Sequence, residues 1–170
     1  MEYLDFLKTK QVKIQKSGFN VDDKDLNPIL FDFQKYCVKK ALSAGRYALF
    51  EDCGLGKTLQ QLEWAKHVSE HTNKPVIILA PLGVIHQTIK EGAKFGYNVS
   101  EISLTVFGQD LKAGIYITNY DNLENIDAYL FGGVVLDESS ILKNFNGKTK
   151  QQLVDDFNET PYKLCCTATP

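Results

Sequence analysis

Arginine is almost absent from this sequence: Arg46 is the only one among 170 residues, so lysine carries nearly all of the positive charge. A guanidinium group binds phosphates as a rigid, two-pronged donor, which the flexible ammonium group of lysine does not reproduce. The chain is therefore poorly supplied with the side chain best suited to stabilise a phosphoryl-transfer transition state. This shortage limits what the chain can catalyse alone.

Metal-binding cysteines and membrane-spanning runs are absent too. The four cysteines show no Cys-x-x-Cys spacing and no nearby pair of histidines, which argues against a zinc site and favours reduced core thiols. No apolar run is long enough to cross a membrane, and Met1–Asp5 is too acidic for a secretory signal. We therefore expect a cytoplasmic protein without a membrane partner. The cysteines are Cys37, Cys53, Cys165 and Cys166.

Length and charge indicate one domain with no strong charge of either sign. A chain of this length buries about 70% of its unfolded surface in one core and is too short for two comfortable domains. The formal net charge of −2 gives no global attraction to nucleic acid, so any polyanion site must be local. Asn27-Pro28 marks a break, and we expect a lead-in segment over residues 1–26 and a main domain over residues 27–170, monomeric when isolated.

Apolar strands and amphipathic helices then alternate, which is typical of a parallel sheet covered on both faces. The expected fold class is therefore α/β. The expected strands are Arg46–Phe50, Pro75–Ala80, Ile115–Thr118, Val134–Leu136 and Tyr162–Cys166, with a less distinct one at Ile102–Phe107. The expected helices are Glu2–Lys8, Leu30–Leu42 with a stop at Gly45, Thr58–Glu70, Val84–Phe95, Asp121–Ile126 and Thr149–Phe157. The apolar residues of Thr58–Glu70 do not share one face, so neighbours should largely cover this helix.

A glycine-rich stretch lies between the first strand and the helix that begins near Lys57. Gly54 and Gly56 let the backbone approach an anion closely, and the N-terminus of the helix points at it. Lys57 adds a mobile positive charge, and the Thr58 hydroxyl can reach Mg²⁺. The stretch departs from the phosphate-loop pattern Gly-x-x-x-x-Gly-Lys-Thr only at its first position, which is Glu51. A chance match in a surface loop is the alternative.

Two carboxylates follow the apolar strand that ends at Leu136. Asp137 would lie beside Mg²⁺, usually through water, while Glu138 would orient or deprotonate an attacking water. An Asp-Glu pair after a strand also occurs as ordinary loop or helix-cap chemistry. Upstream, the side-chain amide of Gln34 is able to read the edge of an adenine, or it is simply an exposed helix glutamine.

These residues, in this order, resemble the first RecA-like domain of superfamily 2 helicases and translocases. The resemblance is strongest to Swi/Snf-type DNA translocases and to the DEAD/DEAH-box-like helicases of phages. Asn27–Gln34 resembles the adenine-sensing Q motif, and Glu51–Gln60 resembles motif I in its Swi/Snf form, in which an acidic residue replaces the first glycine. Val76–Ile85 is similar to motif Ia, Ile115–Tyr120 to motif Ib, Asp137–Ser140 to motif II and Thr167–Pro170 to motif III.

The resemblance implies a RecA-like P-loop NTPase domain that binds ATP and Mg²⁺. In the intact protein it would couple ATP hydrolysis to movement on DNA, with RNA as an open alternative. The implied catalytic residues are Lys57, Asp137 and Glu138, and the implied Mg²⁺ ligands are Thr58 and Asp137. The implied nucleotide-binding residues are Gln34, Gly54, Leu55, Gly56, Lys57, Thr58 and Leu59.

Loops at the carboxyl ends of the strands are the expected nucleic-acid contacts, mostly to phosphate. For His86 and Tyr120, packing within the protein is an equal alternative, and for Lys143 a solvated charged surface. The full set is Pro81, Leu82, Gly83, His86, Thr118, Asn119, Tyr120 and Lys143. Motifs II and III would be coupled through Ser140, Thr167 and Thr169. The family often has Ala-His or Ala-Asp where this chain has Ser139-Ser140, so the coupling side chain is here a short hydroxyl.

In the family a second RecA-like domain supplies arginine fingers. Arg46 precedes the phosphate-loop strand and is badly placed to reach a γ-phosphate, so we expect a domain excised from a longer protein and nearly inactive alone. Two other functions stay open. A P-loop kinase would need an acceptor pocket and usually a lid with basic residues, and no arginine-bearing lid is visible. A nucleotide-responsive scaffold without turnover is disfavoured by the presence of both Asp137 and Glu138.

Overall fold

A six-stranded, entirely parallel sheet organises the chain, with the strand order β1-β6-β5-β2-β4-β3. The computed structural model describes residues 17–102, 110–143 and 147–169, with only the backbone described at 147–149. The strands are β1 (Arg46–Phe50), β2 (Pro75–Ala80), β3 (Val99–Glu101), β4 (Gly114–Asn119), β5 (Gly133–Leu136) and β6 (Tyr162–Thr167). The predicted α/β class is confirmed.

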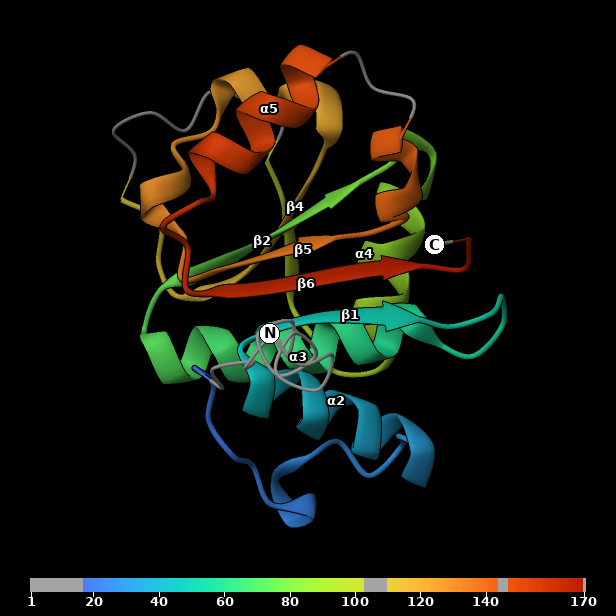
Figure 1. Cartoon of the computed structure of the whole chain (residues 1–170). Helices are drawn as coiled ribbons and strands as arrows, with labels where there is room; N and C mark the ends of the chain where they lie inside the picture. The colour runs from blue at the N-terminus through green and yellow to red at the C-terminus, as the bar shows by residue number, and fades with distance from the viewer. Residues whose placement is uncertain (1–16, 103–109, 144–146, 170) are drawn as a thin grey trace, which may run out of the picture.

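Helices cover both faces of this sheet. In Figure 1, α2 and α3 lie on one side and α5 lies on the other. The α-helices are α2 (Asp32–Ala44), α3 (Lys57–Thr72), α4 (Ile85–Lys94) and α5 (Gly147–Asp156). Short 3-10 turns connect the elements: η1 (Asp23–Asp25), η2 (Leu82–Val84), η3 (Tyr120–Asn125), η4 (Ala128–Leu130) and η5 (Ser139–Lys143).

The continuous apolar run of β2 serves two cores because successive side chains of a strand point to opposite faces. Val76, Ile78 and Ala80 pack with α2 and α3, whereas Ile77 and Leu79 pack with η3, η4 and α5. Because both faces of β2 are buried, neither face carries polar side chains, and its sequence does not alternate between apolar and polar residues.

Helix α3 is covered almost all round, as its sequence predicted. Leu62, Trp64, Ala65 and Val68 are fully buried between the sheet and the neighbouring helices. Helix α2 ends where predicted, because Gly45 follows it with a φ of 78°, a left-handed angle that favours glycine.

One expected element differs from the structure, and two others fall on residues that the structure does not describe. The strand predicted at Ile102–Phe107 is one of these, since residues 103–107 lie outside the described residues; the strand β3, which was not predicted, ends just before Ile102. The predicted helix Asp121–Ile126 is the 3-10 turn η3 instead. Asn119 begins this turn by accepting a hydrogen bond from the backbone N–H of Asn122 at 2.9 Å, and so short a segment takes the tighter turn. The predicted helix Glu2–Lys8 also lies outside the described residues.

The described part of the expected lead-in segment packs on the domain. Its backbone follows the end of α2, with hydrogen bonds from Ser17 N to Ala44 O and from Phe19 N to Leu42 O. The Phe19 ring stacks on His71 with 3.9 Å between the ring centroids. Residues 17–26 therefore share the core with the rest of the chain, and a boundary at residue 27 stays a prediction.

We expect Trp64→Ala to lower the free energy of unfolding by about 3–5 kcal/mol, because the substitution leaves a large cavity beneath the sheet. Trp64 is 0% exposed. Denaturant unfolding followed by circular dichroism measures the loss. Tyr129→Ala is the matched control, since Tyr129 is 76% exposed and its truncation should change stability by no more than about 0.5 kcal/mol. Equal losses in the two variants would contradict the assignment of the core.

Candidate functional site

The carboxyl ends of the strands lie together at one edge of the sheet, because every strand pair is parallel. Open α/β sheets bind their ligands at this edge. Strand β6 lies between β1 and β5, so the segments that follow these three strands start from neighbouring positions. The expected motifs I, II and III therefore meet in space.

The loop from β1 to α3 depends on two glycines in the left-handed region. The φ angle is 81° at Gly54 and 77° at Gly56, where any other side chain would be strained. A Cβ atom on Gly56 would also lie 2.5 Å from Nε2 of Gln34, whereas one on Gly54 would meet nothing within 4 Å. The space beside Gly54 is open, and the positive end of α3 begins directly after Gly56. The loop fits a phosphate group.

Lys57, the first residue of α3, turns its ammonium group back onto this loop. Nζ donates hydrogen bonds to the backbone oxygens of Glu51 at 2.7 Å and of Asp52 at 2.9 Å. The positive charge is thus held at the place where a phosphate would lie, as the sequence predicted for Lys57. Leu59, the other apolar residue assigned to the site, is half-buried against the core, whereas Leu55 is exposed at the loop.

The acidic residue at the first position of the loop has a structural task. Oε2 of Glu51 accepts a hydrogen bond from Nε2 of Gln60 at 2.7 Å. Burial raises the pKa of the Cys37 thiol to about 11, and its hydrogen bond to Glu51 adds to this rise. Glu51 therefore contacts both α2 and α3 at the base of the loop. The sequence showed its position but gave no sign of these partners.

Gln34 is buried against the phosphate loop, with 4% of its surface exposed. Its Nε2 donates to the backbone oxygen of Leu55 at 2.8 Å, and its Oε1 accepts from the backbone N–H of Phe31 at 3.0 Å. Gln34 is therefore not the exposed glutamine of the alternative interpretation. Its placement is compatible with the nucleotide site, and the reading of an adenine edge stays a prediction. Phe31, whose backbone N–H donates to Gln34, is 70% exposed.

Asp137 follows β5 in a buried setting. Burial raises the pKa of its carboxyl group, and a hydrogen bond from Nε2 of Gln61 to Oδ1 at 2.6 Å acts in the opposite direction. The backbone of Asp137 is fixed on both sides: its N–H donates to Leu79 O, and its own carbonyl oxygen accepts from the hydroxyl of Tyr120 at 2.8 Å. Gln61 was missed by the sequence analysis, because a second glutamine in a helix carries no signal of its partner.

Glu138 has a φ angle of 51°, a left-handed conformation that costs a non-glycine residue on the order of 1–2 kcal/mol. Such strain persists only where the surroundings hold it, and it occurs preferentially at functional sites. Here the hydroxyls of Ser140 and Thr167 both donate to Oε1 at 2.7 Å. These hydrogen bonds lower the pKa of Glu138, which keeps the carboxylate ionised at neutral pH.

A chain of hydroxyl groups joins the expected motifs II and III. The Thr169 hydroxyl donates to the Ser140 hydroxyl at 3.2 Å, and the Thr169 backbone N–H donates to the Thr167 hydroxyl at 3.0 Å. Nζ of Lys143 donates to the Thr169 backbone oxygen at 3.3 Å. The short side chain of Ser140 thus reaches Glu138 and Thr169 together, and the three residues assigned to coupling form one network.

The charged groups of motifs I and II lie within electrostatic reach of one another. Besides the larger effects described above, the ammonium of Lys57 lowers the pKa of both Asp137 and Glu138. The Thr58 hydroxyl and the Asp137 carboxylate are the hard oxygen ligands that Mg²⁺ prefers. Among the described residues no group of three or more metal-binding side chains occurs. Mg²⁺ in nucleotide sites is held by one or two protein oxygens together with phosphates and water, so the residue types fit this ion.

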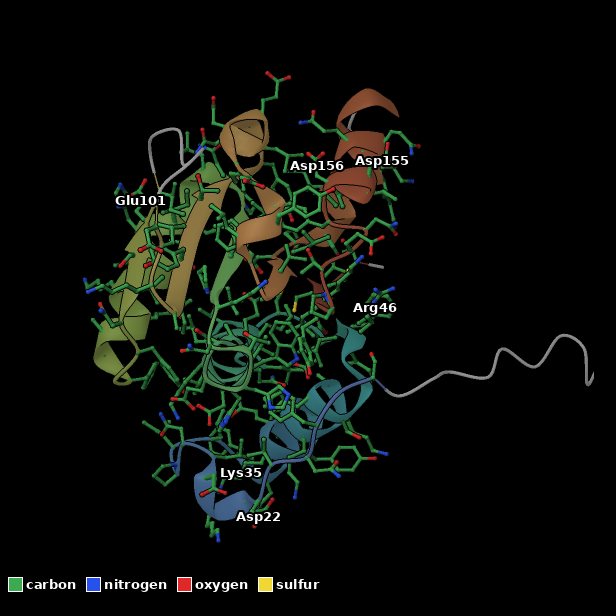
Figure 2. The ribbon with its side chains drawn as sticks, turned by 90° about the vertical axis from the view of Figure 1, so that its left-hand side faces the viewer. Asp22, Lys35, Arg46, Glu101, Asp155 and Asp156 are labelled. Atoms are coloured by element: carbon green, nitrogen blue, oxygen red, sulfur yellow. The ribbon has the colours of Figure 1, made fainter. Side chains whose placement is uncertain are left out.

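The only arginine lies away from this edge. Arg46 is the first residue of β1, so the rise of a strand puts it roughly 13 Å from the residue that precedes the loop. Its Nη2 donates to the backbone oxygen of Asn158 at 3.5 Å, and Figure 2 shows the side chain at the surface of the molecule. This placement agrees with the expectation that Arg46 does not reach a γ-phosphate.

The expected nucleic-acid contacts fall into two groups. Leu82, Gly83, His86 and Lys143 are exposed beyond the carboxyl ends of the strands, while Pro81 and Asn119 are half-buried. Thr118 and Tyr120 are buried, which is contrary to the expected contact for the Thr118 side chain and agrees with the packing alternative for Tyr120. The Thr118 hydroxyl donates to Ile102 O at 2.7 Å, and the Tyr120 hydroxyl holds Asp137. Both hydroxyls therefore make hydrogen bonds within the protein, and that of Tyr120 fixes the backbone of Asp137.

Comparison with known proteins identifies the family. The sequence model of the SNF2-related domain matches residues 35–170, which is most of the chain. The chain belongs to the SNF2-related domain family. The match begins one residue after Gln34, so the assignment of that residue to the nucleotide site rests on its geometry and on the motif resemblance.

Two curated relatives show how much of a larger protein this SNF2-related domain spans. It is 29% identical over 139 residues to the SWI/SNF-related matrix-associated actin-dependent regulator of chromatin subfamily A-like protein 1 of Xenopus laevis, covering 73% of this chain and 14% of that protein. It is 27% identical over 130 residues to putative protein p41 of Acyrthosiphon pisum secondary endosymbiont phage 1, covering 66% of this chain and 28% of that protein. The chain thus spans less than a third of either relative.

Solved structures confirm the fold of this SNF2-related domain as that of a RecA-like ATPase core. The SWI2/SNF2 ATPase core of Sulfolobus solfataricus in complex with dsDNA matches with a TM-score of 0.73 and 21% identity, covering 89% of this chain and 34% of that one. The UvsW helicase of bacteriophage T4 matches with a TM-score of 0.68 and 16% identity, covering 99% of this chain and 61% of that one. No helix within the described residues is long and apolar enough to span a membrane.

Proposed function

We propose that this SNF2-related domain is the ATP-binding motor domain of a DNA helicase or translocase. In the intact protein it couples ATP hydrolysis to movement on nucleic acid. The observation that carries the proposal is the meeting of Lys57, Asp137 and Glu138 at one edge of the sheet, with Glu138 joined by hydroxyl groups to Thr169. The Glu138 carboxylate thus lies at the proposed site of hydrolysis and is also connected by hydrogen bonds to Thr169, outside that site.

The residues of the proposed site divide the work of phosphoryl transfer. When bound, MgATP supplies the terminal phosphoanhydride bond, and hydrolysis of this bond yields ADP and phosphate. The loop backbone and Lys57 would hold the phosphates, and Thr58 and Asp137 would hold the ion. Glu138 orients the attacking water and accepts its proton, a task that an ionised carboxylate outside the metal's own coordination can perform. Gln61 keeps Asp137 in place through its 2.6 Å hydrogen bond.

The hydroxyl network supports coupling between turnover and the nucleic-acid surface. A movement of Glu138 during turnover would displace the oxygen that accepts hydrogen bonds from Ser140 and Thr167. Since both of these hydroxyls accept hydrogen bonds from Thr169, the movement would be passed on to Thr169. Lys143 contacts the same strand end and is exposed beside it. We therefore assign coupling to Ser140, Thr167 and Thr169. We assign phosphate contacts on DNA to the exposed residues beyond the strands: Leu82, Gly83, His86 and Lys143.

DNA is the favoured substrate because of two relatives. One structural match is an ATPase core in complex with dsDNA, and another is the restriction-modification enzyme LlaBIII bound to DNA. Residues 27–170 would then form the first RecA-like domain, and a second domain of the intact protein would supply the missing arginines. An arginine finger raises turnover by about 10³–10⁵-fold in related enzymes.

We expect the 170-residue chain alone to bind ATP weakly and to hydrolyse it hardly at all, with no stimulation by DNA. The protein with its second domain should show DNA-stimulated turnover. A coupled ATPase assay with double-stranded DNA, single-stranded DNA and RNA measures both and separates the three polymers. Brisk DNA-stimulated hydrolysis by residues 1–170 would refute the need for outside arginines. ATP binding without turnover in the intact protein would favour the scaffold, and transfer of phosphate to a small molecule would favour the kinase.

A further inference from the structure

A buried carboxylate that no motif accounts for lies in the middle of α3. Glu63 is 1% exposed and accepts three hydrogen bonds. Its Oε1 accepts from the backbone N–H of Asn27 at 2.8 Å and from Nε2 of His67 at 3.1 Å, and its Oε2 accepts from the Tyr97 hydroxyl. A buried charge is costly unless it is fully hydrogen-bonded, so these three donors make the position tolerable.

The donors come from separate parts of the chain. Asn27 opens the stretch Asn27–Gln34 that resembles the Q motif, called the Q-like segment from here on, and Tyr97 lies just beyond α4. The Asn27 side chain adds two further links, from Nδ2 to Phe95 O and to the Tyr97 hydroxyl, both at 3.1 Å. Burial is the largest single effect and raises the pKa of Glu63, but the hydrogen bonds from His67, Tyr97 and the Asn27 backbone, together with the electrostatic effect of His67, lower this pKa on balance. The carboxylate is therefore ionised and accepts from all of its donors.

The network fixes one end of the segment that carries Gln34. Asn27 is attached to Glu63, and its Oδ1 accepts from the backbone N–H of Ile29 at 3.1 Å, which turns the chain toward α2. The other end is fixed when Gln34 donates to Leu55 of the phosphate loop. Glu63 and Lys57 lie about 9 Å apart along the axis of α3. Because the phosphate loop leads directly into Lys57, the helix sets the distance between the contact at Glu63 and the contact at the phosphate loop.

We propose that Glu63 is a positioning residue for base recognition: it holds the segment from Asn27 to Gln34 in register with the phosphate loop. The inference rests on the proposed function, since it deepens the account of the same nucleotide site. Glu63 acts through Asn27 and touches no nucleotide itself. Removing its anchor lets Gln34 drift relative to Lys57, which weakens discrimination between bases and leaves the phosphate loop unchanged.

The test uses two substitutions in the chain. E63Q keeps the shape of the side chain but replaces one accepting oxygen with an amide NH₂, so one of the three donors loses its acceptor. Y97F removes a single hydroxyl from the same network. The matched control is S69A: Ser69 lies on the same helix, is buried, donates to Lys74 O and accepts from Gly114 N, both at 2.7 Å, and has no contact with Asn27 or Gln34.

Titration calorimetry with ATP, GTP and inorganic tripolyphosphate is the measurement, and circular dichroism checks the fold. We expect E63Q and Y97F to lower the ratio of ATP to GTP affinity about 10-fold, with the affinity for tripolyphosphate unchanged. S69A should lower the thermal midpoint and leave the ratio as it is. If E63Q does not fold, Y97F alone decides.

Three results would overturn the proposal: an unchanged ratio in the folded variants, a loss of tripolyphosphate affinity that accounts for the change, or an equal change in S69A. A wild-type chain that binds ATP but does not prefer it to GTP overturns it as well. Failure of the proposed function has a different signature, because a wild-type chain that binds neither nucleotide nor tripolyphosphate contradicts the nucleotide site as a whole.

Discussion

Glu138→Gln is expected to stop ATP turnover by the intact protein while ATP still binds. The amide keeps an oxygen that accepts from Ser140 and Thr167, so the local structure should survive. It loses the negative charge and the ability to take a proton from water. General-base catalysis contributes about 10²–10⁴-fold, and we expect a fall in kcat of this size with the affinity for ATP changed only a few-fold.

Steady-state ATPase rates with saturating DNA, together with a nucleotide-binding titration, measure the two effects separately. Glu159→Gln is the matched control: Glu159 is exposed just before β6, whereas Glu138 follows the neighbouring parallel strand β5, so the two residues lie at opposite edges of the sheet. It should leave both measurements as they are. Wild-type turnover in the Glu138→Gln protein would contradict the assignment of the catalytic carboxylate.

Lys57→Ala should strongly weaken nucleotide binding and turnover. A hydrogen bond to a charged group contributes about 1.5–3 kcal/mol, so removing the ammonium should weaken ATP binding by about 10- to 100-fold and turnover with it. The substitution also removes the two hydrogen bonds to Glu51 O and Asp52 O that close the loop, which adds to the loss. Titration calorimetry with ATP and with tripolyphosphate measures the effect, and both ligands should be affected alike.

Lys66→Ala is the control for Lys57→Ala, because Lys66 lies on the same helix and pairs with Glu70 at 3.7 Å on the surface. A surface pair of this kind contributes little to stability. Circular dichroism establishes that both variants are folded. An ATP affinity that Lys57→Ala leaves at the wild-type level would show that the loop is not a phosphate site.

The strongest sequence predictions concern features that one short stretch specifies by itself. Uniform apolar composition identified β2, and the pair Gly54 and Gly56 identified the loop, because few conformations suit either pattern. The 3-10 turn η3 was mistaken for an α-helix, since the two differ by geometry more than by composition. The strand β3 was not predicted, because Ser100 and Glu101 are polar residues on an edge strand.

The side-chain contacts between distant segments lay beyond the sequence. Gln61 meets Asp137 across 76 positions, and Glu63 meets Tyr97 across 34, pairings that exist only once the sheet has formed. Tyr120 was considered for DNA contact because it follows a strand. In the structure its side chain is buried, and its hydroxyl donates a hydrogen bond to the backbone oxygen of Asp137. A pattern in sequence locates a loop, whereas the direction of a side chain depends on what packs around it.

Helix α3 begins with Lys57 and also carries the contacts to Glu51, Asp137 and Asn27, all within its first two turns. A helix is stiff over this length, so the phosphate loop, the acidic turn and the Q-like segment move as one body with it. Truncating one contact should therefore disturb only the segment that this contact holds, whereas a change that bends or shifts the helix should disturb all three segments together. Free-energy effects of substitutions that move the helix itself should fail to add.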